Sequence, residues 1–195
     1  MEERGARVRK TTRDLTRQAW FRWTEAVLWF LVVAALAYRF LPAATPPVLG
    51  EGLEAPGFSV RTLAGERFRL SDHRGEVVLV NFWATWCPPC RMEMPGFQRV
   101  YDAYKELGFT VVGLSADVGA GAERAVADFI AANGITYPVA MATPEIQQEY
   151  GGVSSLPQSF LLDREGRLRR RVTGIFDEFR LESAVKDLLA EEGNR

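Results

Sequence analysis

Long apolar runs and amphipathic stretches alternate along most of the chain, and each kind of pattern predicts a different element. Residues 77–82 form a nearly continuous apolar run rich in β-branched side chains, which is typical of a strand buried on both faces of an α/β sheet. Residues 109–114 repeat this pattern and predict the next buried strand. Between the two runs, apolar side chains recur at helical spacing, which predicts a helix from residue 88 to about Leu107 that Gly108 ends.

The remaining elements follow from the same patterns. Short strand-like stretches around glycine-containing turns predict two hairpins, and two further amphipathic stretches predict helices. These elements are hairpin strands at 58–62 and 67–70, a helix at 123–132, a strand or extended segment at 137–141, hairpin strands at 159–163 and 168–172, and a closing helix at 178–190. Strands that alternate with helices and finish in a hairpin predict an α/β fold with a mixed central sheet flanked by helices.

The strand predicted at 77–82 leads into the sequence Trp86-Cys87-Pro88-Pro89-Cys90. The two prolines fit only the first turn of a helix, where their missing N–H groups need no partner, so the cysteines should lie at a helix N-terminus. Unpaired N–H groups and the positive end of the helix dipole favour the thiolate of Cys87, the form that attacks a disulfide. Cys90, about one turn further on, should be more buried and placed to resolve a mixed disulfide formed at Cys87.

Two other uses of such a cysteine pair compete with redox chemistry. A structural zinc site needs about four ligands, and the chain has only these two cysteines and one histidine, His73, in a predicted loop. A purely structural disulfide across two residues would close too small a loop to constrain the unfolded chain much. The position of the pair, after a buried strand and at the start of a helix, favours redox exchange.

The stretch VVLVNFWATWCPPCRMEMP at 77–95 resembles the membrane-tethered thioredoxin-like proteins of the TlpA, ResA and DsbE (CcmG) family. The segments GVSSLPQSFLLDREGRL at 152–168 and RVTG at 171–174 resemble the same family, so the resemblance covers most of the chain. It implies a thioredoxin-like domain over 56–195 with an N-terminal hairpin and an additional element inserted within 117–150. It also implies thiol-disulfide oxidoreductase activity.

The resemblance implies a contact surface for substrate beside the dithiol. A cis peptide is expected between Leu156 and Pro157, with the backbone of Leu156 free to pair with an extended substrate segment. Trp86 and Pro88 are expected on the same surface. Gln158 follows the expected cis-proline where the family usually has threonine or a related residue, so the substrate preference of this chain is open.

A proton acceptor for Cys90 is also implied. Ordinary thioredoxins carry an aspartate for this purpose where this chain has Asn81, and an asparagine side chain cannot titrate. Glu93 lies three residues after Cys90 and matches a glutamate of the tethered reductases, so Glu93 is the expected acceptor. The alternative for Glu93 is a surface glutamate in a helical turn.

Four arginines, at 167 and 169–171, fall at or within the last predicted strand. They could form a docking patch for an acidic partner. The favoured interpretation is an edge strand whose charges block unwanted strand pairing.

The N-terminal part of the chain predicts a membrane anchor. Residues 26–38 carry no charge, and with the aromatic side chains near residue 20 the segment 20–41 reaches the roughly 20 residues that a spanning helix needs. Lys and Arg outnumber acidic residues before Glu25, so the tail 1–19 should be cytoplasmic and the catalytic domain should face outward. Residues 42–55 should form a proline-rich linker. A cleaved signal peptide and a helix of the soluble domain are the alternatives.

Composition and resemblance together define the expected partners. A net charge of −1 gives no support for nucleic-acid binding, and no nucleotide, metal or phosphate motif is visible, so no cofactor is expected. The resemblance implies a reductase of substrate disulfides at the cytoplasmic membrane, with a transmembrane thiol carrier of the CcdA or DsbD type as electron donor. Apocytochrome c and copper-site assembly proteins are the implied substrates. A disulfide-introducing oxidase, a peroxidase related to peroxiredoxins and a non-catalytic peptide-binding or holdase module are the alternatives.

Overall fold

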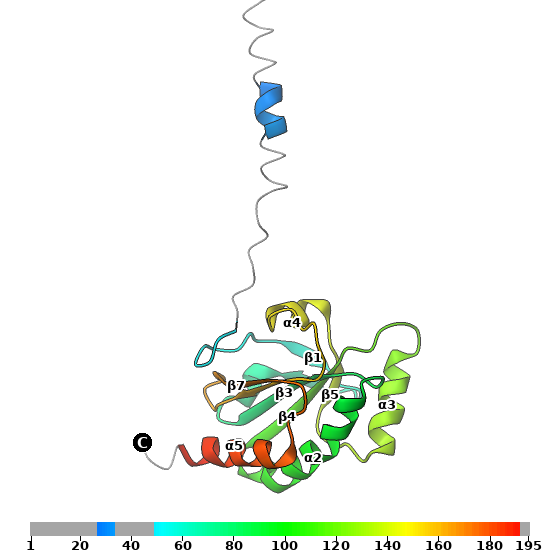
Figure 1. Cartoon of the computed structure of the whole chain (residues 1–195), viewed down its shortest axis with the longest axis vertical. Helices are drawn as coiled ribbons and strands as arrows, with labels where there is room; N and C mark the ends of the chain where they lie inside the picture. Colours follow the sequence, from blue (N-terminus) through cyan, green and yellow to red (C-terminus); the bar gives the residue numbers. More distant parts are fainter. Residues whose placement is uncertain (1–26, 34–48, 192–195) are drawn as a thin grey trace, which may run out of the picture. The chain divides into compact units, whose positions relative to one another are not determined.

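The computed structural model describes residues 27–33 and 49–191 of the chain (Figure 1). The chain divides into two compact units, Met1–Thr45 and Pro46–Arg195. The first unit contains a short helix over residues 27–33 with exposed apolar side chains, and the second contains all the other described elements.

The predicted membrane anchor falls largely outside the described residues. This holds for the tail 1–19, for most of the span 20–41 and for the first half of the linker 42–55. The prediction of a linker is wrong for the second half, because Leu49 and Ala55 are buried in the core of the domain and the Gly52 N–H donates to the Leu168 carbonyl at 2.6 Å. Within the two described ranges, no helix has both the length and the apolar character needed to cross a bilayer.

Five strands of the second unit form one mixed sheet: β3 (Val77–Trp83), β4 (Phe109–Ser115), β5 (Val139–Met141), β6 (Gln158–Leu162) and β7 (Leu168–Thr173). Their order in space is β5-β4-β3-β6-β7. β4 pairs in parallel with both β3 and β5, whereas β6 is antiparallel to both β3 and β7. The mixed α/β sheet predicted from the alternation of strands and helices is therefore confirmed.

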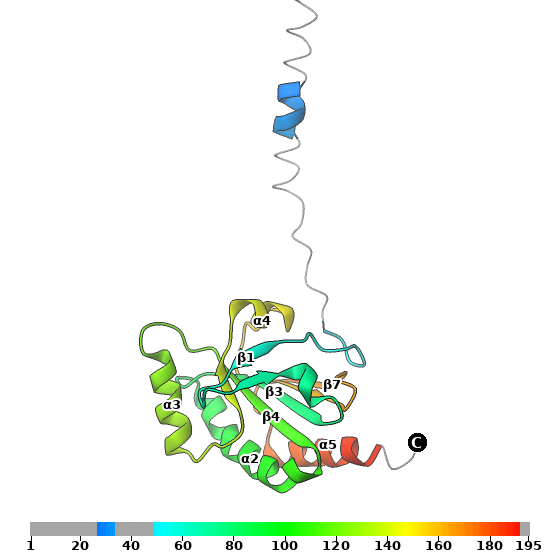
Figure 2. The ribbon, with the colours of Figure 1, turned by 180° about the vertical axis from the view of Figure 1, so that it is seen from behind.

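Helices cover one face of this sheet, and a hairpin with a short helix covers the other (Figures 1 and 2). The first group consists of α2 (Pro88–Tyr104), α3 (Ala122–Ala132) and α5 (Glu178–Ala190). The second consists of β1 (Ser59–Arg61), β2 (Arg67–Arg69), the 3-10 turn η1 (Leu70–His73) and α4 (Pro144–Glu149). The strand that ends at the cysteines, β3, thus lies between two hydrophobic cores.

The alternation of side chains along β3 explains why its sequence is apolar at almost every position. Val77 and Leu79 belong to the core shared with α2 and α5, whereas Val78 and Val80 belong to the core shared with β1, β2 and α4. All seven residues of β3 are buried. Neither face of this strand meets water, so no polar alternation is needed, as expected for the central strand of an α/β sheet.

The helix after the cysteines differs from the prediction in its last turn. α2 ends at Tyr104, and the predicted continuation to Leu107 is a separate 3-10 turn, η2 (Lys105–Leu107). Gly108 ends this segment as predicted, because its φ of 93° lies in the left-handed region that glycine adopts without steric cost. α5 has the bounds predicted for the closing helix.

The segment 117–150, expected to hold an additional element, contains α3, β5 and α4. β5 extends the main sheet beyond β4. The N-terminal hairpin forms its own two-stranded sheet of β1 and β2, and it is connected to β5 through an isolated bridge between Thr62 and Ala140. The inserted segment therefore anchors the N-terminal hairpin to the sheet.

Three of the four clustered arginines, at 169–171, lie on the edge strand β7, as the favoured interpretation predicted, and Arg167 directly precedes that strand. Among the named strands, β6 is the one that pairs with β7. On the other side, the start of β7 is bonded to the segment before β1, since the Leu168 N–H donates to the Leu53 carbonyl at 2.8 Å and the Gly52 N–H donates to the Leu168 carbonyl at 2.6 Å. The guanidinium group of Arg169 binds Glu191 and lies 3.5 Å from the carboxylate of Asp163, and that of Arg171 lies 5.4 Å from the ring centre of Phe160. Two of the four arginines are thus engaged within the domain.

Tyr150 offers a test of how the inserted segment is held. Its buried ring lies 5.0 Å from the Phe160 ring, and its hydroxyl donates to the Pro56 carbonyl at 3.0 Å. Tyr150→Phe should lower the free energy of unfolding by about 1 kcal/mol because the carbonyl loses its donor. Tyr150→Ala should cost about 3 to 5 kcal/mol because it also empties part of the core. Urea denaturation measures both changes.

The matched control is Tyr101→Phe, since Tyr101 is a half-buried tyrosine on α2. This control should change the free energy of unfolding by less than about 0.5 kcal/mol. Equal effects of the two Tyr→Phe replacements would contradict a specific role for the bond between Tyr150 and Pro56.

Candidate active site

The two cysteines lie where β3 ends and α2 begins. Cys87 is the N-cap residue of α2, and Pro88 opens the helix, as the pattern of prolines predicted. The Cys87 N–H donates to the Ala84 carbonyl at 3.1 Å, which closes a turn just before the helix. The sulfur atoms of Cys87 and Cys90 are bonded to each other, with Cα atoms 5.3 Å apart. The structure therefore represents the oxidised form of the pair.

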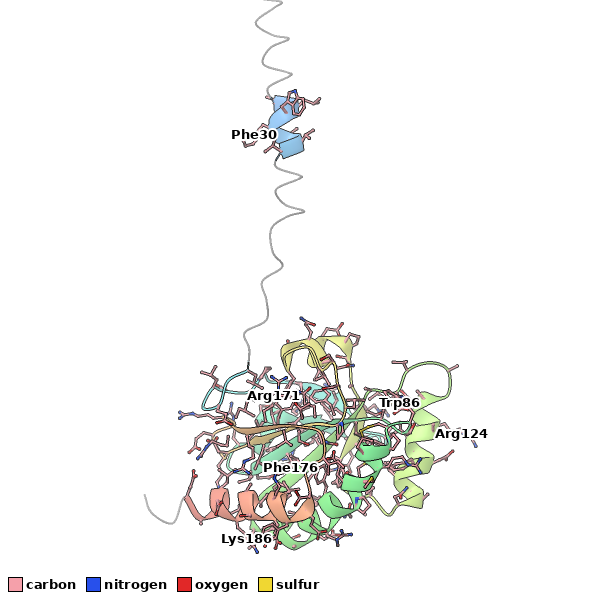
Figure 3. All side chains as sticks on the ribbon, viewed as in Figure 1. Phe30, Trp86, Arg124, Arg171, Phe176 and Lys186 are labelled. Atoms are coloured by element: carbon pink, nitrogen blue, oxygen red, sulfur yellow. A yellow bond between two sulfur atoms is a disulfide. The ribbon has the colours of Figure 1, made fainter. Side chains whose placement is uncertain are left out.

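The surroundings of the two sulfurs are unequal, as predicted. Cys90 is fully buried, whereas Cys87 retains 4% of its surface in contact with solvent. Trp86, which precedes Cys87 in the turn before α2, is 67% exposed (Figure 3). A partner molecule can thus approach Cys87, while Cys90 is reached only through Cys87.

A groove of about 490 Å³ opens beside Cys87. Its walls include three of the residues predicted for the contact surface, Trp86, Pro88 and Leu156. The peptide bond between Leu156 and Pro157 is cis, as the resemblance implied. The structure therefore brings the cis-proline segment and the dithiol together on one groove, although they are far apart in the sequence.

Glu93, on α2 three residues after Cys90, is buried and is not a surface glutamate, since only 4% of it is exposed. One carboxylate oxygen accepts a hydrogen bond from Asn81 Nδ2 at 2.9 Å, and the other accepts from the Phe176 N–H at 2.9 Å. Removal from water raises the pKa of Glu93 to about 7, and the two hydrogen bonds oppose this rise. A carboxyl group with this pKa exchanges its proton near neutral pH.

Asn81 connects Glu93 to the sheet. Its amide nitrogen donates both to Glu93 and, at 3.0 Å, to the hydroxyl of Ser159 on β6. Since Asn81 and Ser159 are paired residues of β3 and β6, the register of the sheet fixes this contact. The network places Glu93 by backbone geometry from three elements: β3, β6 and the segment before α5 that carries Phe176. Phe176 lies between the sheet and α5, and no sequence pattern singled it out (Figure 3).

Gln158, the residue after the cis-proline, is also buried and bound. In the orientation that satisfies its hydrogen bonds, its side-chain oxygen accepts from Arg171 Nε at 2.8 Å and Nη2 at 2.5 Å. Arg171 lies on the neighbouring strand β7 and covers the Phe160 ring. Glutamine at this position is therefore matched by an arginine across the sheet, a pairing that no local sequence signal reveals.

Cys87, Cys90 and His73, the possible ligands of a zinc ion, do not form a metal site. Both cysteines are joined to each other, and His73 binds Glu76 at 3.0 Å and stacks on the Phe68 ring. Across the described ranges, no three His, Cys, Asp or Glu side chains meet in an arrangement that could hold a metal ion.

Comparison with known sequences places the chain among redox proteins. A sequence model of the AhpC/TSA family matches residues 52–171. A thiol-disulfide oxidoreductase ResA of Bacillus thuringiensis subsp. konkukian (strain 97-27) is 38% identical over 138 residues, covering 70% of this chain and 78% of that protein. The thioredoxin-like protein YneN of Bacillus subtilis (strain 168) is 33% identical over 147 residues, covering 74% and 85%.

Solved structures give the same grouping. A thiol:disulfide interchange protein of the thioredoxin family from Chlorobium tepidum TLS superposes with a TM-score of 0.66 at 34% identity, covering 72% of this chain and 98% of that one. StoA from Bacillus subtilis superposes with a TM-score of 0.58 at 30% identity, covering 66% and 95%. In both cases nearly the whole length of the relative's chain is matched.

Burial of Glu93 predicts a specific dependence of stability on pH. Its folded pKa of about 7 exceeds the value of about 4.3 in an unfolded chain. The stabilisation from the protonated carboxyl is therefore complete below about pH 4.3 and is lost as the pH rises through 7. Glu93→Gln removes this dependence. The difference in unfolding free energy, Glu93→Gln minus wild type, should therefore increase by about 2 to 3 kcal/mol from pH 5 to pH 8, because wild type alone loses stability over this range.

The measurement is urea denaturation of the oxidised proteins at the two pH values. Glu106→Gln, at an exposed glutamate of η2, serves as the control and should follow wild type at both. If Glu93→Gln also follows wild type, the carboxyl group does not titrate between these pH values and the assigned pKa is wrong.

Proposed function

Since the chain belongs to the AhpC/TSA family, and within it to the ResA, TlpA and DsbE group of thiol-disulfide oxidoreductases, we propose that it is a membrane-tethered, outward-facing reductase of protein disulfides. Dithiol-disulfide exchange is the activity of the thiol-disulfide oxidoreductase group, and Cys87 and Cys90 are the cysteine pair of this chain. The direction of electron flow, the tether and the partners are the parts that we propose.

The reductase direction is supported by the small number of groups that can stabilise a Cys87 thiolate. A dithiol is a strong oxidant when its reduced form is stabilised, as in DsbA. The helix start was expected to favour the Cys87 thiolate through its N–H groups, but Pro88 and Pro89 remove two of these groups, and the Cys90 N–H donates to the Cys87 sulfur at 3.4 Å. The described residues that line the groove include no lysine, arginine or histidine. A reduced pair with so little stabilisation should give up its electrons readily.

Glu93 supports the second half of the proposed cycle. The Cys87 thiolate attacks one sulfur of a substrate disulfide, whose S–S bond breaks, and the departing sulfur takes a proton from water. Cys90 then gives its proton to Glu93, and its thiolate attacks the Cys87 sulfur and releases the second substrate thiolate, which is protonated in turn. The substrate gains two electrons, and the enzyme is left with the Cys87–Cys90 disulfide. Glu93 suits the role of proton acceptor because its pKa is about 7.

A separate dithiol must reduce the enzyme after each cycle. By resemblance to the tethered family, we propose a transmembrane thiol carrier of the CcdA or DsbD type as this donor, and apocytochrome c or copper-site assembly proteins as substrates. The basic tail 1–19 and the apolar segment 20–41 support an anchor that leaves residues 56–195 on the outer side of the cytoplasmic membrane. Of the predicted linker 42–55, the proline-rich part before Leu49 would hold that domain away from the bilayer, since Leu49 and Ala55 pack in the core of the domain.

The reduction potential of the Cys87–Cys90 pair tests the direction of electron flow. Titration of the full chain in detergent against dithiothreitol, with tryptophan fluorescence as the readout, should give a value near that of thioredoxin, about −270 mV. A value near that of DsbA, about −120 mV, would contradict the reductase proposal and support the disulfide-introducing alternative.

A pair of proline variants tests the physical reason for that value. Pro89→Ala restores an N–H at the second helical position, from which it can reach an N-cap side chain. One added bond of this kind should make the potential about 30 mV less negative, since 30 mV corresponds to about 1.4 kcal/mol. Pro88→Ala is the matched control, because an N–H at the first position does not point at the N-cap sulfur. Equal shifts for both variants would contradict the explanation.

Substrate trapping in intact cells tests the orientation and the substrate class. The Cys90→Ser variant cannot resolve a mixed disulfide, so Cys87 should remain bonded to proteins of the outer side, which gel electrophoresis without reductant would separate. Cys87→Ser is the control and should form no adducts, because Cys90 is fully buried. Adducts with cytoplasmic proteins would contradict the orientation. Peptide binding without adducts would support the holdase alternative.

A further inference from the structure

The turn that carries Cys87 is held from the neighbouring strand by a carboxylate. Asp117, just beyond the end of β4, accepts from the Thr85 N–H at 2.9 Å through Oδ2 and from the Thr85 hydroxyl at 2.5 Å through Oδ1. Thr85 lies inside the turn that the bond from Cys87 N–H to the Ala84 carbonyl closes. Both polar hydrogens of one turn residue are thus bound by one side chain from a different part of the sequence.

The orientation of Asp117 is itself fixed by β4. The hydroxyl of Ser115, the last residue of that strand, donates to Asp117 Oδ2 at 2.7 Å and accepts from the Asp117 N–H at 3.1 Å. The next backbone bond, from Ala116 N–H to the Trp83 carbonyl at 2.8 Å, ties the same segment to the end of β3. Asp117 therefore acts as a rigid extension of the sheet, and not as a mobile surface carboxylate.

We propose that Asp117 is a positioning residue for dithiol exchange, which fixes the turn at Thr85 so that the Cys87 sulfur stays over the Cys90 N–H. Asp117 accepts three hydrogen bonds with two oxygens, and a carboxylate forms stronger bonds of this kind than a neutral acceptor. The Cys90 N–H lies 3.4 Å from the Cys87 sulfur, so a small displacement of the turn would break the contact.

The same residue connects two sides of the groove. Ala116, one position before Asp117, lines the groove together with Trp86 and Cys87. Val118, one position after it, is 90% exposed at the start of a loop whose Gly119 and Gly121 have positive φ. Asp117 thus fixes the groove wall at Ala116 and the turn at Thr85 in one arrangement, while the loop beyond it projects into solvent.

The proposal rests on exchange at Cys87 and Cys90 and is independent of the direction of electron flow. Loosening the turn would withdraw the Cys90 N–H from the Cys87 thiolate, and the pKa of the Cys87 thiol would rise. A smaller fraction of thiolate at neutral pH means slower attack on a disulfide. A role in stability alone would lower the resistance to urea and leave the thiol pKa unchanged.

The experiment uses the full chain in detergent, reduced beforehand. The pH dependence of iodoacetamide modification gives the pKa of Cys87, and the rate of reaction with oxidised glutathione gives the efficiency of attack. Thr85→Val removes the hydroxyl bond but keeps the backbone bond and the charge, Asp117→Ala removes both bonds and the charge, and Asp117→Asn keeps an acceptor without the charge. Asp187→Ala, at an exposed aspartate on α5, is the control.

Attack at pH 7 should be slowed about threefold in Thr85→Val and about tenfold in Asp117→Ala, with a raised thiol pKa in both. Asp117→Asn should lie between wild type and Asp117→Ala, and Asp187→Ala should match wild type. An unchanged thiol pKa in Thr85→Val and Asp117→Ala would overturn the proposal. A lowered pKa of the Cys87 thiol in Asp117→Ala and Asp117→Asn would also overturn it, because the negative charge of Asp117, and not its hydrogen bonds to Thr85, would then be what affects the thiol. A reduction potential near that of DsbA would overturn the reductase proposal alone.

Discussion

Burial of β3 on both faces is the constraint on which the rest of the structure depends. Its alternate side chains fill two separate cores, so a shift of register by one residue would move every side chain into the wrong core. The end of the strand is therefore fixed, and with it the position of Cys87 at the start of α2. Asn81 lies on this strand and holds Glu93, and the turn that contains Thr85 follows directly from its end.

A second feature of the site is an ionisable group placed where ionisation is costly. Glu93 is buried away from water, and among the described residues two neutral N–H donors, from Asn81 and Phe176, compensate its charge. A leucine at this position would suit the core better. The domain thus gives up stability at neutral pH to keep an ionisable carboxyl group in its interior, three residues after Cys90.

Local chemistry explains which features could be predicted from the sequence. The apolar run of β3, the two prolines after Cys87 and the glycine at 108 each act through local chemistry, so the strand, the helix start and the stop at Gly108 agree with the prediction. The contacts of Gln158 with Arg171 and of Thr85 with Asp117 depend on which strands are neighbours and in what register, and no short pattern carries that information. The 3-10 turn after Tyr104 was missed because helical periodicity does not distinguish it from one more α-helical turn.

The unequal burial of the two sulfurs also bears on damage by peroxide. A small oxidant can reach Cys87 and convert its thiolate to a sulfenic acid, but the fully buried Cys90 is shielded from it. Cys90 lies at bonding distance from that sulfur and can condense with the sulfenic acid, releasing water and restoring the ordinary disulfide. Oxidation at Cys87, the more accessible of the two cysteines, therefore returns the enzyme to a state within its own cycle before the irreversible sulfinic and sulfonic acids form.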